Sequence, residues 1–176
     1  MVTGAPNRFV HESMRSVVMA VETVPAELAV LLRREAMLLD QRDYHGWLDL
    51  FTEDCRYWMP VDPDAADEPD TLCHVFDDHA RLTDRVWRTA NGAHTEDPPA
   101  RTARVLGEPV HLARDADEVS CFTPFLLLYS RRGRQETFGG SYQHRAVTTP
   151  DGWRIREKRI RLIDGQSALP ALTIIF

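Results

Sequence analysis

The chain is 176 residues long, 43% of its residues are hydrophobic, and four are Trp. This length fits one domain with a single substantial core, whereas disordered chains are poorer in aromatic and apolar residues. The formal net charge is −6, and the basic residues are scattered along the sequence. This distribution excludes the clustered basic surface of a nucleic-acid-binding protein.

The cysteines are odd in number and far apart: Cys55, Cys73 and Cys121. Such an arrangement argues against a secreted disulfide framework and favours reduced thiols in the cytoplasm. Charged residues such as Glu12 and Arg15 interrupt the apolar N-terminal region. We therefore expect a cytoplasmic protein without a signal peptide or membrane span.

The first 24 residues alternate only weakly in hydrophobicity and are expected to form an arm. A helix should follow, because Pro25 and Glu27 suit a first helical turn. Apolar residues recur at helical spacing, with Glu35 as the exception in the series Leu28, Leu31, Leu32, Leu38 and Leu39. A break at residues 41–43 separates this helix from a short second helix predicted over residues 44–51.

A strand is predicted over residues 55–59, and Pro60 should end it because proline cannot donate to a sheet ladder. Residues 61–70 contain two prolines and five acids and are expected to form a solvated loop. After an extended segment at 71–76, Asp77 or Asp78 can cap a third helix that ends near residue 89.

From residue 100 onward the hydrophobic pattern changes to period two, which predicts strands. They are placed from residue 102 to 106 and over 119–129, 135–147 and 153–163, with turns near 114–118, 133 and 150–152. The apolar tail at 170–176 is expected to be buried. Helices followed by an antiparallel meander predict an α+β fold, a single domain over residues 25–176.

A set of motifs in this order resembles a known family. Residues 34–48 read REAMLLDQRDYHGWL, similar to an EA..LD...Y..WL motif, and residues 57–60 read YWMP. Further matches are Asp77-Asp78-His79 with Leu82 and Arg85, residues 91–99, Arg101-Thr102 with Arg104, residues 138–145, residues 152–155, and Arg159, Leu162 and Asp164. The ordered set resembles the small β subunit of Rieske-type aromatic-ring-hydroxylating dioxygenases, in the benzene, biphenyl, cumene and phenylpropionate branch.

This resemblance implies a cystatin-like cone, similar to ketosteroid isomerase, in which a curved, mostly antiparallel sheet wraps around N-terminal helices. It also implies a non-catalytic, structural subunit of an α3β3 hexamer. In such an oxygenase the α subunit carries the Rieske [2Fe–2S] cluster and a mononuclear Fe(II), and ferredoxin and an NADH-dependent reductase supply electrons. The complex forms cis-dihydrodiols from arenes, and this chain would hold no cofactor.

The residues agree with a chain that binds no iron. A Rieske cluster needs Cys-x-His and Cys-x-x-His pairs, and none of the cysteines has this spacing. A mononuclear iron site needs two His and one carboxylate. His74 and His79, with Asp70, Asp77 and Asp78 nearby, are the candidates to check, but the spacing also suits helix-capping and hydrogen-bonding roles.

A second hypothesis is a stand-alone dehydratase or isomerase with a pocket inside the cone, and a third is a module that only binds a ligand. The candidate residues of the enzyme are Asp40, Tyr44, Tyr57, His79 and His144. Asp40 or His79 would be the general base and Tyr44 or Tyr57 the donor to an oxyanion. The competing interpretation pairs Asp40 with Arg42 or a helix end. The large side chains of Trp47, Phe51, Trp58 and Phe125 would then fill the pocket.

The RIREKRIR segment at residues 154–161 is polar on both faces if it is a regular strand. One face would carry Ile155, Glu157, Arg159 and Arg161, and the other Arg154, Arg156, Lys158 and Ile160. We expect such a strand at a subunit interface, where arginine makes bidentate pairs. Arginines at 131, 132 and 134 predict a hairpin tip that is solvated or meets an acidic partner.

Overall fold

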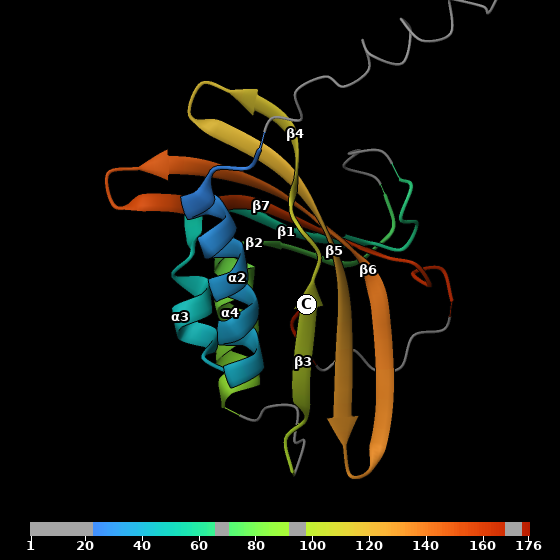
Figure 1. The fold of residues 1–176 in the computed structure, drawn as a ribbon. Helices are drawn as coiled ribbons and strands as arrows, with labels where there is room; N and C mark the ends of the chain where they lie inside the picture. Colours follow the sequence, from blue (N-terminus) through green and yellow to red (C-terminus); the bar gives the residue numbers. More distant parts are fainter. Residues whose placement is uncertain (1–22, 66–70, 92–97, 168–173) are drawn as a thin grey trace, which may run out of the picture.

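The computed structural model describes residues 23–65, 71–91, 98–167 and 174–176. A curved sheet is covered on one side by helices α2, α3 and α4 (Figure 1). The α+β cone expected from the sequence is therefore confirmed. In the described part of the chain, no helix has the length and apolar character needed to cross a membrane.

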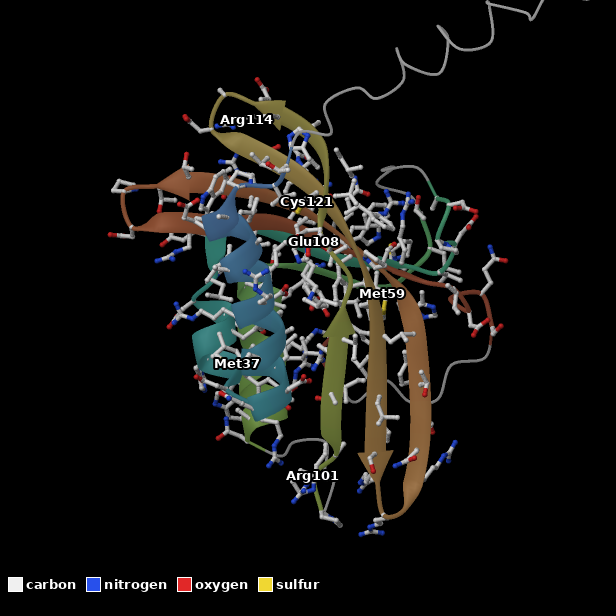
Figure 2. All side chains as sticks on the ribbon, in the orientation of Figure 1. Met37, Met59, Arg101, Glu108, Arg114 and Cys121 are labelled. Atoms are coloured by element: carbon white, nitrogen blue, oxygen red, sulfur yellow. The ribbon has the colours of Figure 1, made fainter. Side chains whose placement is uncertain are left out.

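Helix α2 (Ala26–Gln41) buries the apolar stripe predicted from the sequence. Pro25 precedes its first residue, and Arg42 ends it in the left-handed conformation with φ 61°. Glu35 lies on the buried side of the helix and is 2% exposed. The opposite side faces outward, and Figure 2 shows Met37 there, where it is 48% exposed.

Two short helices begin where aspartate side chains cap them. Asp43 accepts from the Gly46 N–H at 3.0 Å to start α3 (Tyr44–Leu48), and Asp78 accepts from the Arg81 N–H at 2.9 Å to start α4 (His79–Ala90). The predicted cap of the third helix is thus confirmed. The second helix is shorter than predicted, because the chain enters the sheet at Phe51 and extended pairing replaces the helical turn.

The sheet has seven strands in the order β2-β1-β7-β6-β5-β3, with β4 also paired to β5. The strands are β1 (Phe51–Pro60), β2 (Cys73–Asp78), β3 (Arg101–Leu106), β4 (Val110–Asp115), β5 (Glu118–Arg131), β6 (Arg134–Thr149) and β7 (Gly152–Leu162). Among the strands of the described residues, only β1 and β7 pair in parallel. Arg132 and Gly133, both at positive φ, form the tight turn predicted between β5 and β6.

Strand β4 was not predicted from the sequence. It shares an edge of β5 with β3: β3 pairs with residues 125–130 of β5 and β4 with residues 118–122. Five of its six residues are exposed, so its sequence lacks the alternation that a half-buried strand shows. Thr23 forms an isolated bridge with Val110, and residues 1–22 of the expected arm lie outside the described residues.

A bulge in β7 changes which side chains face the core. Arg145 of β6 pairs with Glu157 and Ala146 pairs with Ile155, so Arg156 has no partner in the ladder. Because of this extra residue, Ile155 and Lys158 point to the same, inner side. The predicted faces are therefore correct from Glu157 onward, but wrong for Ile155, which was predicted to share a face with Glu157.

Side chains fill the space between the helices and the sheet (Figure 2). Trp47, Phe51 and Phe125 lie in this core, as predicted. Trp58 is also buried, but it follows the inward-facing Tyr57 and lies on the other face of the sheet, where Arg159 lies over its ring, so its predicted place in the pocket is wrong. The chain end also lies inside, beside β3 in Figure 1, and Ile175 and Phe176 are 4% and 1% exposed. This burial confirms the prediction for the end of the tail, whereas residues 168–173 lie outside the described residues.

Candidate functional site

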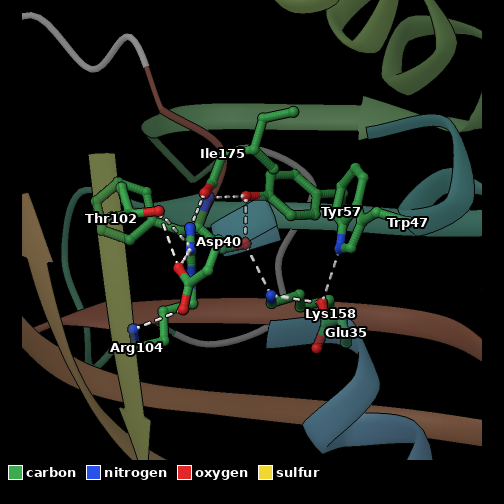
Figure 3. Close-up of polar contacts among 9 residues, drawn as sticks. Glu35, Asp40, Trp47, Tyr57, Thr102, Arg104, Lys158 and Ile175 are labelled. Atoms are coloured by element: carbon green, nitrogen blue, oxygen red, sulfur yellow. Dashed lines mark hydrogen bonds and ion pairs between the residues drawn. The ribbon is translucent and has the colours of Figure 1, made fainter. Parts of the chain in front are cut away.

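The strand register places three polar side chains side by side on the inner face of the sheet. His144 of β6 pairs with Lys158 of β7, and Lys158 pairs with Tyr57 of β1. Glu35 of α2 meets this row from the helical side (Figure 3). Lys158, His144 and Tyr57 are each 1–2% exposed, so the cluster is shielded from water.

Glu35 is the centre of the cluster. Lys158 Nζ donates to Glu35 Oε1 at 2.6 Å, and Trp47 Nε1 donates to the same oxygen at 3.2 Å. His144 Nε2 lies 3.0 Å from Oε2. A carboxylate only accepts, so Nε2 must carry the proton. Three donors on different elements thus satisfy one buried carboxylate.

Electrostatics keep Glu35 ionised despite its burial. Burial alone would raise the pKa of its carboxyl, but the charge of Lys158 and the contact with His144 hold this pKa well below its usual range. For Lys158, burial lowers the pKa of the amine to about 8, while Glu35 opposes the shift. Near neutral pH the two groups therefore form a buried ion pair.

A second polar group lies at the end of α2. Asp40 accepts from Thr102 Oγ1 at 2.9 Å and from the Arg104 backbone N–H at 2.8 Å, and it also forms an ion pair with Arg104 Nη1. The predicted partners of Asp40, Arg42 or a helix end, are therefore wrong. The carboxylate instead ties α2 to β3, and its three donors leave it poorly placed to act as a base.

The chain end joins the two groups. Lys158 Nζ donates to the Phe176 main-chain oxygen at 2.7 Å, and Tyr57 Oη donates to the same oxygen at 3.1 Å. The Phe176 N–H donates back to Tyr57 Oη at 3.0 Å. Arg104 Nη2 donates to the Ile175 oxygen. The space inside the cone is thus occupied by the protein's own residues.

Three of the five residues named for the pocket-enzyme hypothesis meet in this region: Asp40, Tyr57 and His144. Tyr44 and His79 are the half-buried first residues of α3 and α4 and lie outside the row on the sheet. Burial raises the pKa of Tyr57 beyond its usual range, so its hydroxyl keeps its proton. Asp40 and Tyr57 are linked indirectly: Asp40 binds Arg104, Arg104 donates to the Ile175 oxygen, and Tyr57 binds Phe176.

Sequence reasoning missed the roles of Glu35, Lys158 and Arg104. A signal for Glu35 was present, since a charged residue inside an otherwise apolar helical stripe needs a buried partner. Lys158 is the only lysine among the 21 basic residues of the chain. Lys158 was assigned to a subunit interface because the bulge at Arg156, which turns Lys158 to the same side as Ile155, cannot be recognised from the sequence.

The candidate iron ligands have other partners. His74 Nε2 lies 2.7 Å from the Gly165 oxygen, and His79 begins α4. Asp77 accepts from Arg85 Nε at 2.6 Å, and Asp78 caps the helix. Asp70 lies outside the described residues. Over the residues that the structure covers, no three or more His, Cys, Asp or Glu side chains are grouped as metal ligands.

Comparison with protein families finds a match over residues 34–166 to the family described as "Ring hydroxylating beta subunit". The small oxygenase component of the p-cumate 2,3-dioxygenase system of Pseudomonas putida is 36% identical over 137 residues, which is 76% of each chain. The β subunit of 3-phenylpropionate/cinnamic acid dioxygenase of Photorhabdus laumondii is 28% identical, covering 85% of this chain and 90% of that protein.

Solved structures share the fold. The β subunit of benzoate 1,2-dioxygenase from Burkholderia mallei superposes with a TM-score of 0.72 at 22% identity, covering 87% of this chain and 98% of that one. A chain of naphthalene 1,2-dioxygenase superposes with a TM-score of 0.67 at 14% identity, covering 100% of both chains.

Proposed function

This chain belongs to the ring-hydroxylating β-subunit family, and from that membership we propose that it is the structural, non-catalytic subunit of an aromatic-ring-hydroxylating dioxygenase. The observation that carries the proposal is the family match over residues 34–166, which includes β1 to β7. The chain is accordingly part of an oxidoreductase, the terminal oxygenase component, whose reaction takes place on a partner α subunit.

The interior of the cone supports a non-catalytic role. Glu35 accepts a hydrogen bond from Lys158, and Asp40 accepts one from the backbone N–H of Arg104. Lys158 also donates to the main-chain oxygen of Phe176. A general base must reach a substrate proton, whereas the carboxylates here accept from buried donors of the same chain. We therefore assign no catalytic residue to this chain, including Asp40 and His79 of the pocket-enzyme hypothesis.

The outer face of the sheet supports assembly. Four exposed apolar side chains gather there: Val105 of β3, Leu126 and Leu128 of β5, and Ile163 after β7, with exposures of 67%, 56%, 40% and 73%. Val105 pairs with Leu126, and Leu126 and Ile163 both flank Gly139 of β6. We call these four residues the outer patch. Contiguous exposed apolar surface of this kind marks protein contacts.

We propose the finer composition of the complex from the family. Three copies of this chain and three α subunits form an α3β3 hexamer. The Rieske [2Fe–2S] cluster and the mononuclear Fe(II) reside on the α subunit, and ferredoxin and reductase deliver electrons from NADH for cis-dihydrodiol formation. The three free cysteines, Cys55, Cys73 and Cys121, support placement in the reducing cytoplasm. Residues 25–176 form the single domain and residues 1–24 the arm.

Co-expression with the α subunit of the proposed oxygenase tests the proposal. We expect size-exclusion chromatography to give one large brown complex that contains both chains and consumes O2 with an arene and electron donors. Each chain expressed alone is the control, and this chain alone should be colourless. A colourless chain that stays separate from α would contradict the assignment.

The same complex tests the absence of catalytic residues. Asp40→Asn and His79→Gln should leave the turnover per iron centre within about twofold of the unaltered complex. A loss of turnover beyond about 100-fold, the scale of losing a general base, with an intact hexamer would favour the dehydratase or isomerase chemistry of a pocket enzyme.

A further inference from the structure

The last described residues, 174–176, lie inside the cone without joining a strand. The main-chain groups of Phe176 bond to the side chains of Tyr57 and Lys158, and the Ile175 oxygen accepts from Arg104. A strand would instead bond to neighbouring backbone. The segment is therefore held as a bound peptide is held, by side chains from three strands.

The ring of Phe176 packs against other aromatic side chains. Its centroid lies 5.3 Å from that of Phe138 and 6.4 Å from that of Phe125, both in edge-on geometry. Phe125 in turn stacks on Tyr142 at 4.0 Å. Such contacts favour a phenyl ring over an aliphatic group of similar size.

The groups that hold the segment are positioned by other parts of the protein. Glu35 orients Lys158 through the 2.6 Å ion pair, and Asp40 pairs with Arg104. Both carboxylates are on α2, so the donors keep their places whether or not the segment is bound. A site with preorganised donors binds more tightly, because less freedom is lost on binding.

We propose that the interior of the cone is a binding site for a phenyl ring linked to a hydrogen-bonding carbonyl group, as in a phenylalanyl peptide, and that residues 174–176 occupy it as an exchangeable internal ligand. This activity goes beyond the assembly role and does not depend on it. A tethered ligand acts at high effective concentration, so free ligand binds well only when the segment is removed or weakened.

The single lysine gives a direct test. In the folded protein an amine-reactive acylating reagent should leave Lys158 almost unlabelled, because the side chain is 1% exposed. Deletion of residues 174–176 should raise the labelling rate at least tenfold, measured by mass spectrometry of the peptide that contains Lys158. The peptide N-acetyl-Ile-Ile-Phe should restore protection, and N-acetyl-Ile-Ile-Gly should not. Because only this lysine is read, the assay works on the chain alone and within the α complex.

Two results would overturn the proposal: a folded, shortened chain that stays protected without peptide, or equal protection by both peptides. If the shortened chain is unfolded alone, N-acetyl-Ile-Ile-Phe should refold it, and failure to do so also counts against the site.

Phe176→Ala in the full chain is a second, milder variant. It keeps the main-chain bonds and empties only the ring position, so toluene should raise its Tm. The unaltered chain and Leu126→Ala, a deletion of similar type on the outer patch, should not respond. An equal response of all three would place toluene elsewhere, and no response of folded Phe176→Ala would exclude the ring site.

Discussion

At the scale of single residues, the buried charges of Glu35 and Lys158 decide how the helices dock on the sheet. The pair joins α2 to β7, and Trp47 and His144 form further hydrogen bonds to the Glu35 carboxylate. Removing two charges from water is expensive, and such a pair is stable only with good geometry and further hydrogen bonds. Removal of either partner would therefore leave the other as an unpaired buried charge.

Lys158→Met should lower the free energy of unfolding by about 3–5 kcal/mol, because Glu35 would remain buried without a counter-charge. Urea unfolding measures this loss. Glu35→Gln combined with Lys158→Met should recover part of it, since no charge is then left unpaired. The control is Arg134→Met, which removes an ion pair with Glu136 whose arginine is 75% exposed, and should cost about 0–1 kcal/mol. Similar losses for the two single variants would contradict the role of the pair.

The pKa of Glu35 gives a pH dependence with a definite sign. Since this pKa is held below the ordinary 4.5 in the folded state, the unfolded chain binds more protons as the pH falls below 4.5. Stability present above that pH is then lost, with a slope of up to about 1.4 kcal/mol per pH unit. Urea unfolding between pH 5 and 3 should show a shallower decline for the Glu35→Gln/Lys158→Met variant than for the unaltered chain. Parallel declines would refute the assignment.

At the scale of elements, the close approach of β6 and β7 shapes the inner surface. A Cβ on Gly140 would clash with the Arg161 carbonyl oxygen, so the backbone of β6 or β7 would have to move to make room for it. The bulge at Arg156 lies on the same pair of strands and turns Lys158 inward. Helix caps and the β5–β6 turn followed from local sequence, but these two features required the neighbouring strand.

Gly140→Ala should destabilise the chain by about 1–3 kcal/mol, the usual cost of forcing extra volume into a packed site. Gly139→Ala is the matched control, because its added Cβ would meet only the flexible ends of Ile163 and Leu126, at 3.3 and 3.5 Å. Thermal unfolding should therefore show a clear drop in Tm for Gly140→Ala and little change for Gly139→Ala. Equal effects would argue against a close approach specific to Gly140.

At the scale of the whole molecule, the two faces of the sheet carry different kinds of side chain. Its inner face holds the polar cluster and the chain end, and its outer face carries the outer patch. Residues 154–161 were predicted to form a strand that is polar on both faces, and such a strand was expected at a subunit interface. The structure instead places Lys158 in an internal ion pair, and we propose the outer patch as the contact surface.

Leu126→Asp should reduce the yield of the α-containing complex by at least tenfold at equal expression, because it places a charge in the outer patch. Val30→Asp is the matched control, since Val30 of α2 is equally exposed, at 56%. Circular dichroism should show both variants folded, and size-exclusion chromatography should show assembly lost only for Leu126→Asp. Unimpaired assembly of Leu126→Asp would exclude the outer patch as a subunit contact.

The sequence by itself determined the family, the α+β class, the apolar stripe of α2, an aspartate cap at residue 77 or 78 and the burial of Phe176. These features depend on local periodicity, capping and ordered motifs, which are written in neighbouring residues. Only the tertiary structure decided the partners of Glu35, Asp40 and Lys158. Glu35 and Lys158 are 123 residues apart, and Asp40 and Arg104 are 64 apart. Their pairing depends on strand register and on a bulge, which are set by how the strands pack against one another.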